Sequence, residues 1–196
     1  MTFMIEIPKY TMKTFDPNGL AVNERTDFTR RIPTGLSDKQ MARAAKLCRQ
    51  LVNIENDARG AKAQRMIILF YNHARLLSNP HYWEIMRTVW VAAGSTETAA
   101  MFRKMMQSSR PCRSWFMTPE DAEALEKMQF PLTVHRAYDA ERYPGDTDPG
   151  ISWTLDGQWC REYAKAKGRV VKSRMVERSE VFAYISRRAE EEIIIL

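Results

Sequence analysis

The chain has 196 residues, of which 44% are hydrophobic, so it can bury a real core, and extensive disorder is excluded. No apolar run reaches the ~18 residues that a membrane span needs, and the start of the chain lacks the basic and apolar regions of a signal peptide, so we expect a cytoplasmic protein with no membrane partner. The net charge of +6 lies before Pro131, because eleven acidic residues balance eleven basic ones from there on; a basic front half indicates either contact with nucleic acid or an acidic partner, or an ordinary solvated surface.

Residues 1–35 are predicted to form a polar arm. Pro8, Pro17 and Pro33 interrupt this segment, and only Phe3–Ile7 has the composition of a short strand. The arm has little apolar periodicity, so we expect it to lie outside the main core.

Residues 36–130 are predicted to form a helical region. Its first helix follows Ser37, which makes a capping box with Gln40, and apolar residues then recur at helical spacing. Pro80 suits the first turn of a helix, and Ser95 and Thr118 are suitable N-caps. Four further helices are therefore expected at 66–77, from 79 to about 93, at 95–105 and at 118–128.

The pattern changes at residue 131 and becomes rich in strands. Apolar and β-branched runs predict strands at 131–136, 151–155, 169–176, 181–185 and 190–196. Asp156 can cap a short helix that Gly168 ends, since glycine is preferred just past the last turn. The expected fold class is therefore α+β, with a helical N-terminal region (36–130) and a small β-sheet domain (131–196).

Two strands of the last region carry polar side chains that could share a site. Alternation along a strand places Ser152 and Thr154 on one face, with Trp153 on the apolar face. The same rule places Glu190 together with Glu192, where paired carboxylates could stabilise a cationic transition state. Each pattern alone is also common at a solvated sheet edge.

An arginine precedes both pairs. Arg136 ends the first apolar strand, directly after His135. Such an arginine is often only a surface cation, but its planar guanidinium can also clamp a phosphate or a carboxylate. The order of the three elements is therefore arginine, then Ser-x-Thr after a glycine, then Glu-x-Glu before an apolar strand.

This order resembles the Arg/Ser-Thr-Ser/Glu family of ADP-ribosyltransferases, and most closely its compact members from bacterial and phage genomes. The region that contains the matching segments spans about a third of the chain. They are His135-Arg136-Ala137, Gly150 to Asp156, Tyr163-Ala164 and Glu190 to Ile193. His-Arg-Ala stands where these relatives have Tyr-Arg-Gly, and Trp153 occupies the middle position of the Ser-Thr-Ser motif.

The resemblance implies a split β-sheet domain that binds NAD as its substrate and transfers ADP-ribose to a macromolecular acceptor. Glu192 would stabilise the ribose cation and Ser152 would hold Glu192, while Glu190 would activate the acceptor. Arg136, with His135 beside it, would grip the NAD pyrophosphate, and Thr154 would support the strand. Tyr163 or Tyr138 would stack on nicotinamide, unless these rings are simply core. A Glu-x-Glu pair in this family favours a protein arginine as acceptor, and the basic front half keeps nucleic acid open.

Three alternatives remain beside this hypothesis. A non-catalytic relative could keep the fold and bind a nucleotide or a partner, and a helical nucleic-acid-binding protein could use its β-rich half only as structure. An RNA 2′-phosphotransferase would share the fold and need a more basic cleft. Of the three alternatives, the RNA 2′-phosphotransferase is the closest to the ADP-ribosyltransferase hypothesis.

The remaining chemistry-bearing residues suggest packing rather than catalysis. His73 and His81 lack metal-ligand spacing, and the scattered Cys48, Cys112 and Cys160 suit reduced core thiols, so no metal site is expected. Trp83 and Trp90 share one helical face and are predicted to be core, as is Trp153.

Overall fold

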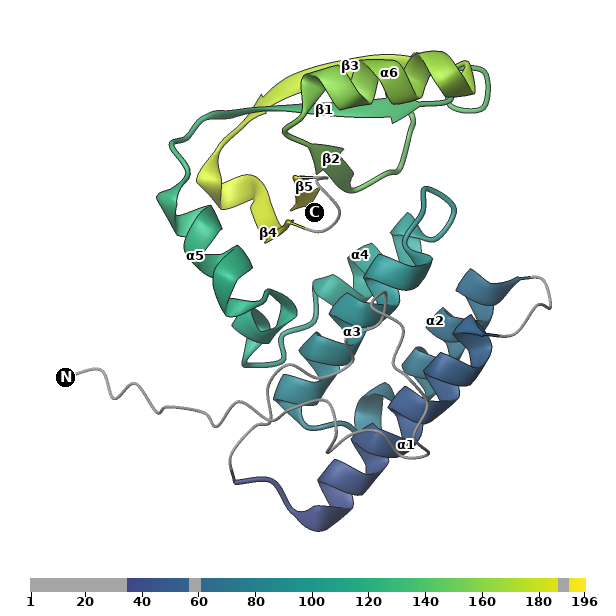
Figure 1. The fold of residues 1–196 in the computed structure, drawn as a ribbon, viewed down its shortest axis with the longest axis vertical. Helices are drawn as coiled ribbons and strands as arrows, with labels where there is room; N and C mark the ends of the chain where they lie inside the picture. Colours follow the sequence, from purple (N-terminus) through teal and green to yellow (C-terminus); the bar gives the residue numbers. More distant parts are fainter. Residues whose placement is uncertain (1–34, 57–60, 187–190) are drawn as a thin grey trace. The chain divides into compact units, whose positions relative to one another are not determined.

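The computed structural model describes residues 35–56, 61–186 and 191–196. The predicted strand Phe3–Ile7 and nearly all of the arm lie outside these residues, as does Glu190. The described part consists of helices and a small antiparallel sheet, which confirms the α+β class (Figure 1). No helix in it is long and apolar enough to cross a membrane.

The chain folds as two compact units that differ from the predicted division at residue 130. Unit 1 contains the described residues up to Gly94 and Ser109–Phe116, and unit 2 contains Ser95–Ser108 and Met117–Leu196. Two of the predicted helices thus belong with the sheet. Their attachment depends on contacts between distant residues, which helical periodicity does not reveal.

Unit 1 is helical. Its elements are α1 (Asp38–Glu55), α2 (Lys62–His73), η2 (Ala74–Leu76), α3 (Asn79–Ala93) and η3 (Arg113–Phe116). The capping box of Ser37 and Gln40 is present at the start of α1, as predicted. Trp83 and Trp90 are buried, which confirms them as core.

Unit 2 contains the remaining helices. They are α4 (Ala99–Met106), α5 (Pro119–Lys127), α6 (Gly157–Lys167) and the short η4 (Pro144–Asp146) and η5 (Arg178–Glu180). Thr118 and Asp156 cap α5 and α6 as predicted, because each side chain accepts a hydrogen bond from a first-turn N–H. Helix α4 begins later than predicted: its N-cap is Thr98, and Ser95 donates its backbone N–H to the Thr98 hydroxyl.

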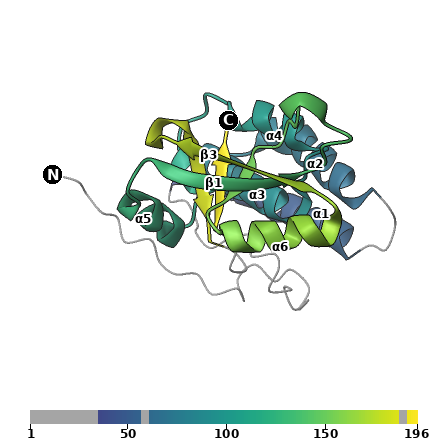
Figure 2. The same ribbon diagram turned by 90° about the horizontal axis from the view of Figure 1, so that it is seen from above.

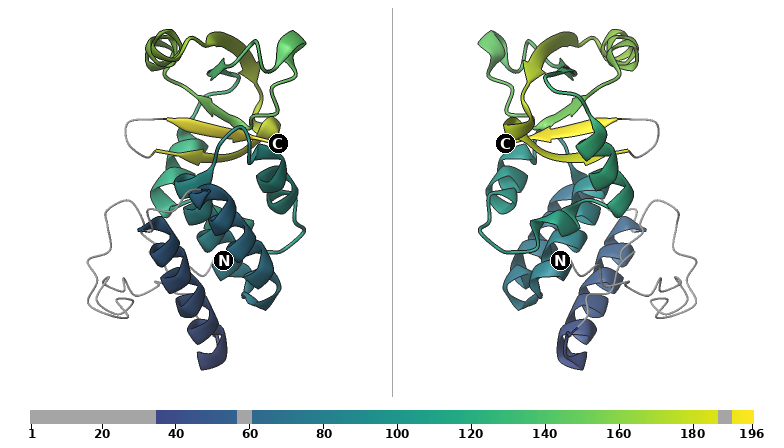
Figure 3. Two further views of the ribbon diagram at one scale, coloured as in Figure 1. Left: turned by 90° about the vertical axis from the view of Figure 1, so that its right-hand side faces the viewer. Right: turned by 90° about the vertical axis from the view of Figure 1, so that its left-hand side faces the viewer.

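The five strands of unit 2 form one antiparallel sheet. They are β1 (Leu132–Tyr138), β2 (Ser152–Thr154), β3 (Val170–Val176), β4 (Val181–Ile185) and β5 (Glu192–Ile195), in the order β3-β1-β2-β5-β4. Strands β1 and β3 pair along their whole length, with α6 beside them (Figure 2). Strands β4 and β5 form the other end of the sheet (Figure 3). Between β1 and β2 the register contains a single pair, His135 with Thr154, so the two strands separate beyond it.

The core of unit 2 lies on one face of this sheet, under α5. Its buried members come from α5 and all five strands. They are Leu125, Val134, Trp153, Val176, Val181, Tyr184, Ile193 and Ile195. Trp153 is therefore core, as alternation predicted. Helix α5 is also fixed to the end of β4, because the buried Asp121 accepts hydrogen bonds from the backbone and hydroxyl of Ser186.

Candidate functional site

The predicted site residues lie on three neighbouring strands. Arg136 is on β1, Ser152 and Thr154 are on β2, and Glu192 is the first residue of β5. Strand β2 lies between β1 and β5 in the sheet. Segments separated by up to 40 residues in the chain are thus brought side by side.

Ser152 and Glu192 are joined directly. The Ser152 hydroxyl donates to Oε1 of Glu192 at 2.5 Å, and both side chains are half-buried. The register pairs Glu192 with Thr154, whose side chain is buried and accepts the backbone N–H of Asp156 at 3.0 Å. The serine therefore fixes one carboxylate oxygen, while the threonine holds the turn from β2 into α6.

Arg136 reaches the same strand from the other side. Its Nη1 donates to the backbone carbonyl of Ser152 at 2.6 Å. Ser152 lies two residues from Thr154, which makes the single β1–β2 pair with His135. Where the two strands separate, the guanidinium therefore bonds the Ser152 carbonyl in place of a backbone N–H of β1. Arg136, Ser152 and Glu192 consequently form one chain of hydrogen bonds.

A carboxylate holds the guanidinium in this position. Asp148 accepts from Nε of Arg136 at 2.5 Å and from Nη2 at 3.3 Å, and the hydroxyl of Thr96 accepts from Nη2 at 2.8 Å. The side chain of Arg136 is only 10% exposed, and that of Asp148 is fully buried. The arginine is therefore anchored by protein acceptors on three sides.

The charge around Asp148 is balanced by more than one cation. Burial by itself would raise the pKa of this carboxyl, but hydrogen bonding and charge from Arg136, the N–H of Gly150 and the charge of Lys172 together lower it below its ordinary value. Lys172 Nζ lies 4.0 Å from Oδ2 of Asp148. Two positive groups thus lie beside this carboxylate.

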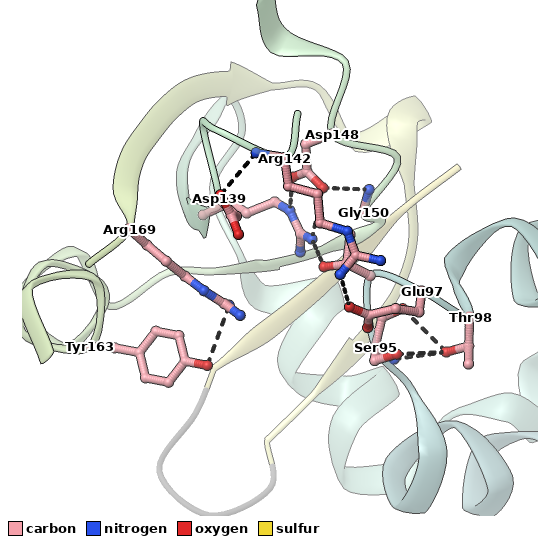
Figure 4. Close-up of polar contacts among 11 residues, drawn as sticks. Ser95, Glu97, Thr98, Asp139, Arg142, Asp148, Gly150, Tyr163 and Arg169 are labelled. Atoms are coloured by element: carbon pink, nitrogen blue, oxygen red, sulfur yellow. Dashed lines mark hydrogen bonds and ion pairs between the residues drawn. The ribbon is translucent and has the colours of Figure 1, made fainter. Parts of the chain in front are cut away.

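Gly150 is required by the position of the arginine. A Cβ atom built on Gly150 would lie 1.7 Å from Nη2 of Arg136. Any residue other than glycine would therefore clash with the guanidinium and force it to move. Figure 4 shows the Asp148 carboxylate turned toward the Gly150 amide, with the Arg142–Glu97 ion pair nearby. The loop between β1 and β2 is therefore shaped around the guanidinium.

His135 and Arg136 leave β1 on opposite faces. The register pairs His135 with Thr154 and Thr154 with Glu192, so these three side chains share a face and Arg136 starts on the other. The ring of His135 contacts Ser173 Oγ at 2.7 Å through Nδ1. Arg136 and Glu192 therefore start on opposite faces of the sheet and are linked through Ser152, whose carbonyl accepts from Arg136 and whose hydroxyl donates to Glu192.

Tyr163 contacts two neighbouring side chains. It stacks on Trp159 with centroids 5.2 Å apart and an interplanar angle of 9°, and the Arg169 guanidinium lies 5.5 Å from its centroid. Its hydroxyl accepts from Nη1 of Arg169 at 3.4 Å. Trp159 therefore already occupies one face of the ring on which nicotinamide would stack. Tyr138, the other candidate ring, has Lys172 Nζ at 5.2 Å.

Sequence patterns did not identify two of the residues in this network. Asp148 lies in a turn-rich stretch where aspartate is ordinary, and Thr96 precedes a helix that was assigned to the other domain. Neither has a periodic relation to Arg136. Their partnership with the guanidinium is a long-range contact that only the fold reveals.

Residues that could bind metals do not gather in a cluster. No group of three or more His, Cys, Asp or Glu side chains suited to a metal ion occurs in the described ranges. All three cysteines are free thiols, but Cys112 is exposed, which corrects its assignment to the core. Cys48 and Cys160 are buried, and burial raises the pKa of both thiols.

Comparison with known proteins gives no further assignment of this site. No protein-family model, curated protein or solved structure matches the chain. The chemistry of the site is therefore argued from its own geometry and from the motifs in the sequence.

Proposed function

We propose that the protein is an NAD-dependent mono-ADP-ribosyltransferase whose catalytic residues lie in unit 2. The proposal rests mainly on the chain of hydrogen bonds from Arg136 through Ser152 to Glu192. These are the residues that the order of motifs selects, and the fold links them across three strands. The split-sheet architecture implied by the resemblance is part of the same proposal.

Glu192 would act on the ribose of NAD. When the bond between ribose C1′ and the nicotinamide nitrogen breaks, the bonding electrons leave with nicotinamide and positive charge develops on the ribose. A carboxylate already held by Ser152 stabilises that charge without having to reorganise. An acceptor nucleophile then bonds to C1′ and gives up its proton, for which Glu190 is the proposed base.

Arg136 has a positioning role in this proposal as well as an electrostatic one. Its anchored guanidinium holds the Ser152 carbonyl and so sets the position of β2. Asp148 offsets part of its charge, and Lys172, 4.0 Å from the same carboxylate, is a second cation toward which the NAD pyrophosphate would be drawn. Thr154 keeps the end of β2 fixed.

The central test replaces the two described acids of this segment one at a time. Glu192→Gln keeps the shape of the side chain and removes its charge, so hydrolysis of NAD should fall by about 10²- to 10³-fold. Glu191→Gln is the matched control, because the Glu191 side chain is exposed and its backbone carbonyl, which the change keeps, accepts a hydrogen bond from Leu155. Release of nicotinamide from the full chain measures both. Equal losses in the two variants would contradict the proposal.

Transfer and hydrolysis can be separated at the neighbouring acid. Glu190→Gln should reduce transfer of label from NAD to a lysate more than it reduces hydrolysis, because the proposed role of Glu190 concerns the acceptor alone. Equal losses of both activities would assign Glu190 to the ribose instead.

A second candidate is a non-catalytic protein that uses the same fold to bind a nucleotide or a partner. The enclosed position of Arg136, with Asp148 and Thr96 on its guanidinium, favours this candidate. It predicts that NAD or a fragment of it binds without release of nicotinamide. Calorimetry with NAD beside the nicotinamide assay distinguishes the two functions.

A further inference from the structure

An aromatic pair lies on the surface of α6. Trp159 is 37% exposed although it is one of the largest apolar side chains of unit 2. It stacks in parallel with Tyr163, one helical turn further on. The Arg169 guanidinium donates to the Tyr163 hydroxyl (Figure 4) and lies 5.5 Å from the centroid of that ring. The indole is therefore already held in a fixed orientation, with part of its surface open to a ligand.

The same helix and the strand after it carry an excess of positive charge. Residues 157–176 contain six basic residues and one acidic residue, although the sequence from Pro131 onward is balanced overall. Four of these cations are exposed and pair with no carboxylate among the described residues; they are Arg161, Lys165, Lys167 and Arg169. The single acid, Glu162, accepts a hydrogen bond from Gln158.

We propose that this surface of α6, formed by Trp159, Tyr163 and Lys167 at successive helical turns with Arg169 beside Tyr163, binds single-stranded nucleic acid. An exposed, pre-stacked ring offers a platform for an unpaired base, and neighbouring cations suit the phosphates of the strand. A duplex hides the faces of its bases, so the aromatic pair selects a single strand. The inference rests on the proposed function only in naming this strand as the ADP-ribose acceptor.

The orientation of the stack favours a base over other ligands. An acidic peptide would use the cations but would leave the indole without a partner of matching shape. Arg169 donates to the Tyr163 hydroxyl and its guanidinium lies 5.5 Å from the centroid of that ring, so a planar cation lies beside the stack. Bases, aromatic rings and guanidinium groups stack on one another in this way at single-strand sites.

Binding of a labelled oligonucleotide to the full chain tests the aromatic part. The probe is a fluorescein-labelled oligouridylate of about 12 nucleotides, within the usual site size, with the deoxy version and a duplex of equal length beside it. Trp159→Ala should weaken binding of the single strands by about 5- to 150-fold, the value of one stacked base. Trp159→Phe should recover most of the loss, and Met175→Ala, at an exposed apolar residue of β3, should have no effect.

The salt dependence of binding tests the charged part. Lys167→Ala should reduce the slope of log K against log salt by about 0.7, because one single-strand phosphate contact is lost. Lys104→Ala, at an exposed lysine of α4, should leave the slope unchanged. No binding of the single strand, or equal binding of the duplex with no effect of Trp159→Ala, would overturn the inference.

These measurements are made without NAD, so they fail independently of the proposed function. If the chain binds the strand and releases no nicotinamide, the nucleic-acid surface is supported and the proposed transferase activity is contradicted. If the chain consumes NAD and binds no strand, the transferase activity is supported and the nucleic-acid surface is contradicted. Labelled NAD supplied with the bound oligonucleotide then shows whether the strand is the acceptor.

Discussion

At the residue scale, the Asp148–Arg136 pair is the contact on which the site geometry depends. Both side chains are almost inaccessible to water, and the guanidinium passes the constraint to the Ser152 carbonyl. A buried pair contributes little net stability compared with apolar packing, yet breaking it leaves an uncompensated charge. The pair therefore serves position more than stability.

Asp148→Asn should destabilise unit 2 by about 3 kcal/mol, because Arg136 would remain buried without its counter-charge. A urea unfolding curve measures the change. Glu123→Gln, at an exposed partner of Lys127 on α5, is the matched control and should leave the midpoint unchanged. If both variants shift the midpoint equally, the pair has no special role.

The pH dependence of this variant follows from the lowered pKa of Asp148. A carboxyl whose folded pKa lies below its ordinary value of 3.8 stabilises the fold above that value and loses the contribution as pH falls through the folded pKa. The difference in stability between wild type and Asp148→Asn should therefore be constant at neutral pH and shrink below about pH 4. Urea midpoints on both sides of that pH measure it; a difference that shrinks only near neutral pH would implicate another group.

At the element scale, local signals predicted the elements well. Caps at Ser37, Thr118 and Asp156 and alternation around Trp153 are short-range effects, so they can be recognised without knowledge of the fold. Two helices are exceptions. Helix α2 runs from Lys62 to His73 where a helix was predicted at 66–77. Helix α4 begins late, since Ser95 and Thr98 are both suitable caps and the Ser95 N–H donates to the Thr98 hydroxyl.

Gly168 provides a prediction about such a local signal. It ends α6 with φ +61°, and a Cβ atom there would meet nothing within 4 Å, so only backbone strain opposes a side chain. Gly168→Ala should cost about 1 kcal/mol, and Gly168→Asn less, since asparagine tolerates the left-handed region better. Thermal unfolding measures both. An alanine variant as stable as wild type would mean that the helix end can adopt another conformation.

The candidate site could be predicted in part. Ser152 and Glu192 follow from strand alternation together with the order of motifs, and the structure joins them directly. The contribution of Asp148 and Thr96 could not be predicted, because a buried ion pair leaves no periodic trace in the sequence. The face from which Arg136 leaves β1 also depended on a register that no local pattern fixes.

At the scale of the whole molecule, the division into units is discontinuous. The chain leaves unit 1 after Gly94, returns for Ser109–Phe116 and leaves it again. A boundary placed where composition changes, at residue 130, therefore misses α4 and α5. Such a boundary would separate Arg136 from Thr96 and the core of the sheet from Leu125.

Each unit should also respond to acid in its own range. His81 of unit 1 is buried, and burial lowers its pKa from 6.5 to about 4. Between these values the unfolded chain binds a proton that the folded chain does not, so stability should fall as pH drops through this range, by up to about 3 kcal/mol. His81→Gln keeps a polar partner for Ser78 and should remove this dependence in urea unfolding between pH 7 and pH 4. An unchanged slope in the variant would assign the acid sensitivity elsewhere.

The strand order has a consequence for the newly made chain. Strand β5 is translated after the other four strands, yet it lies between β2 and β4. Until residues 192–195 emerge from the ribosome, β2 and β4 have no common neighbour and Ser152 has no Glu192 to hold. The nascent polypeptide therefore lacks the carboxylate that the proposed chemistry needs while residues 1–191 are made, and any protein truncated before residue 192 is released without it.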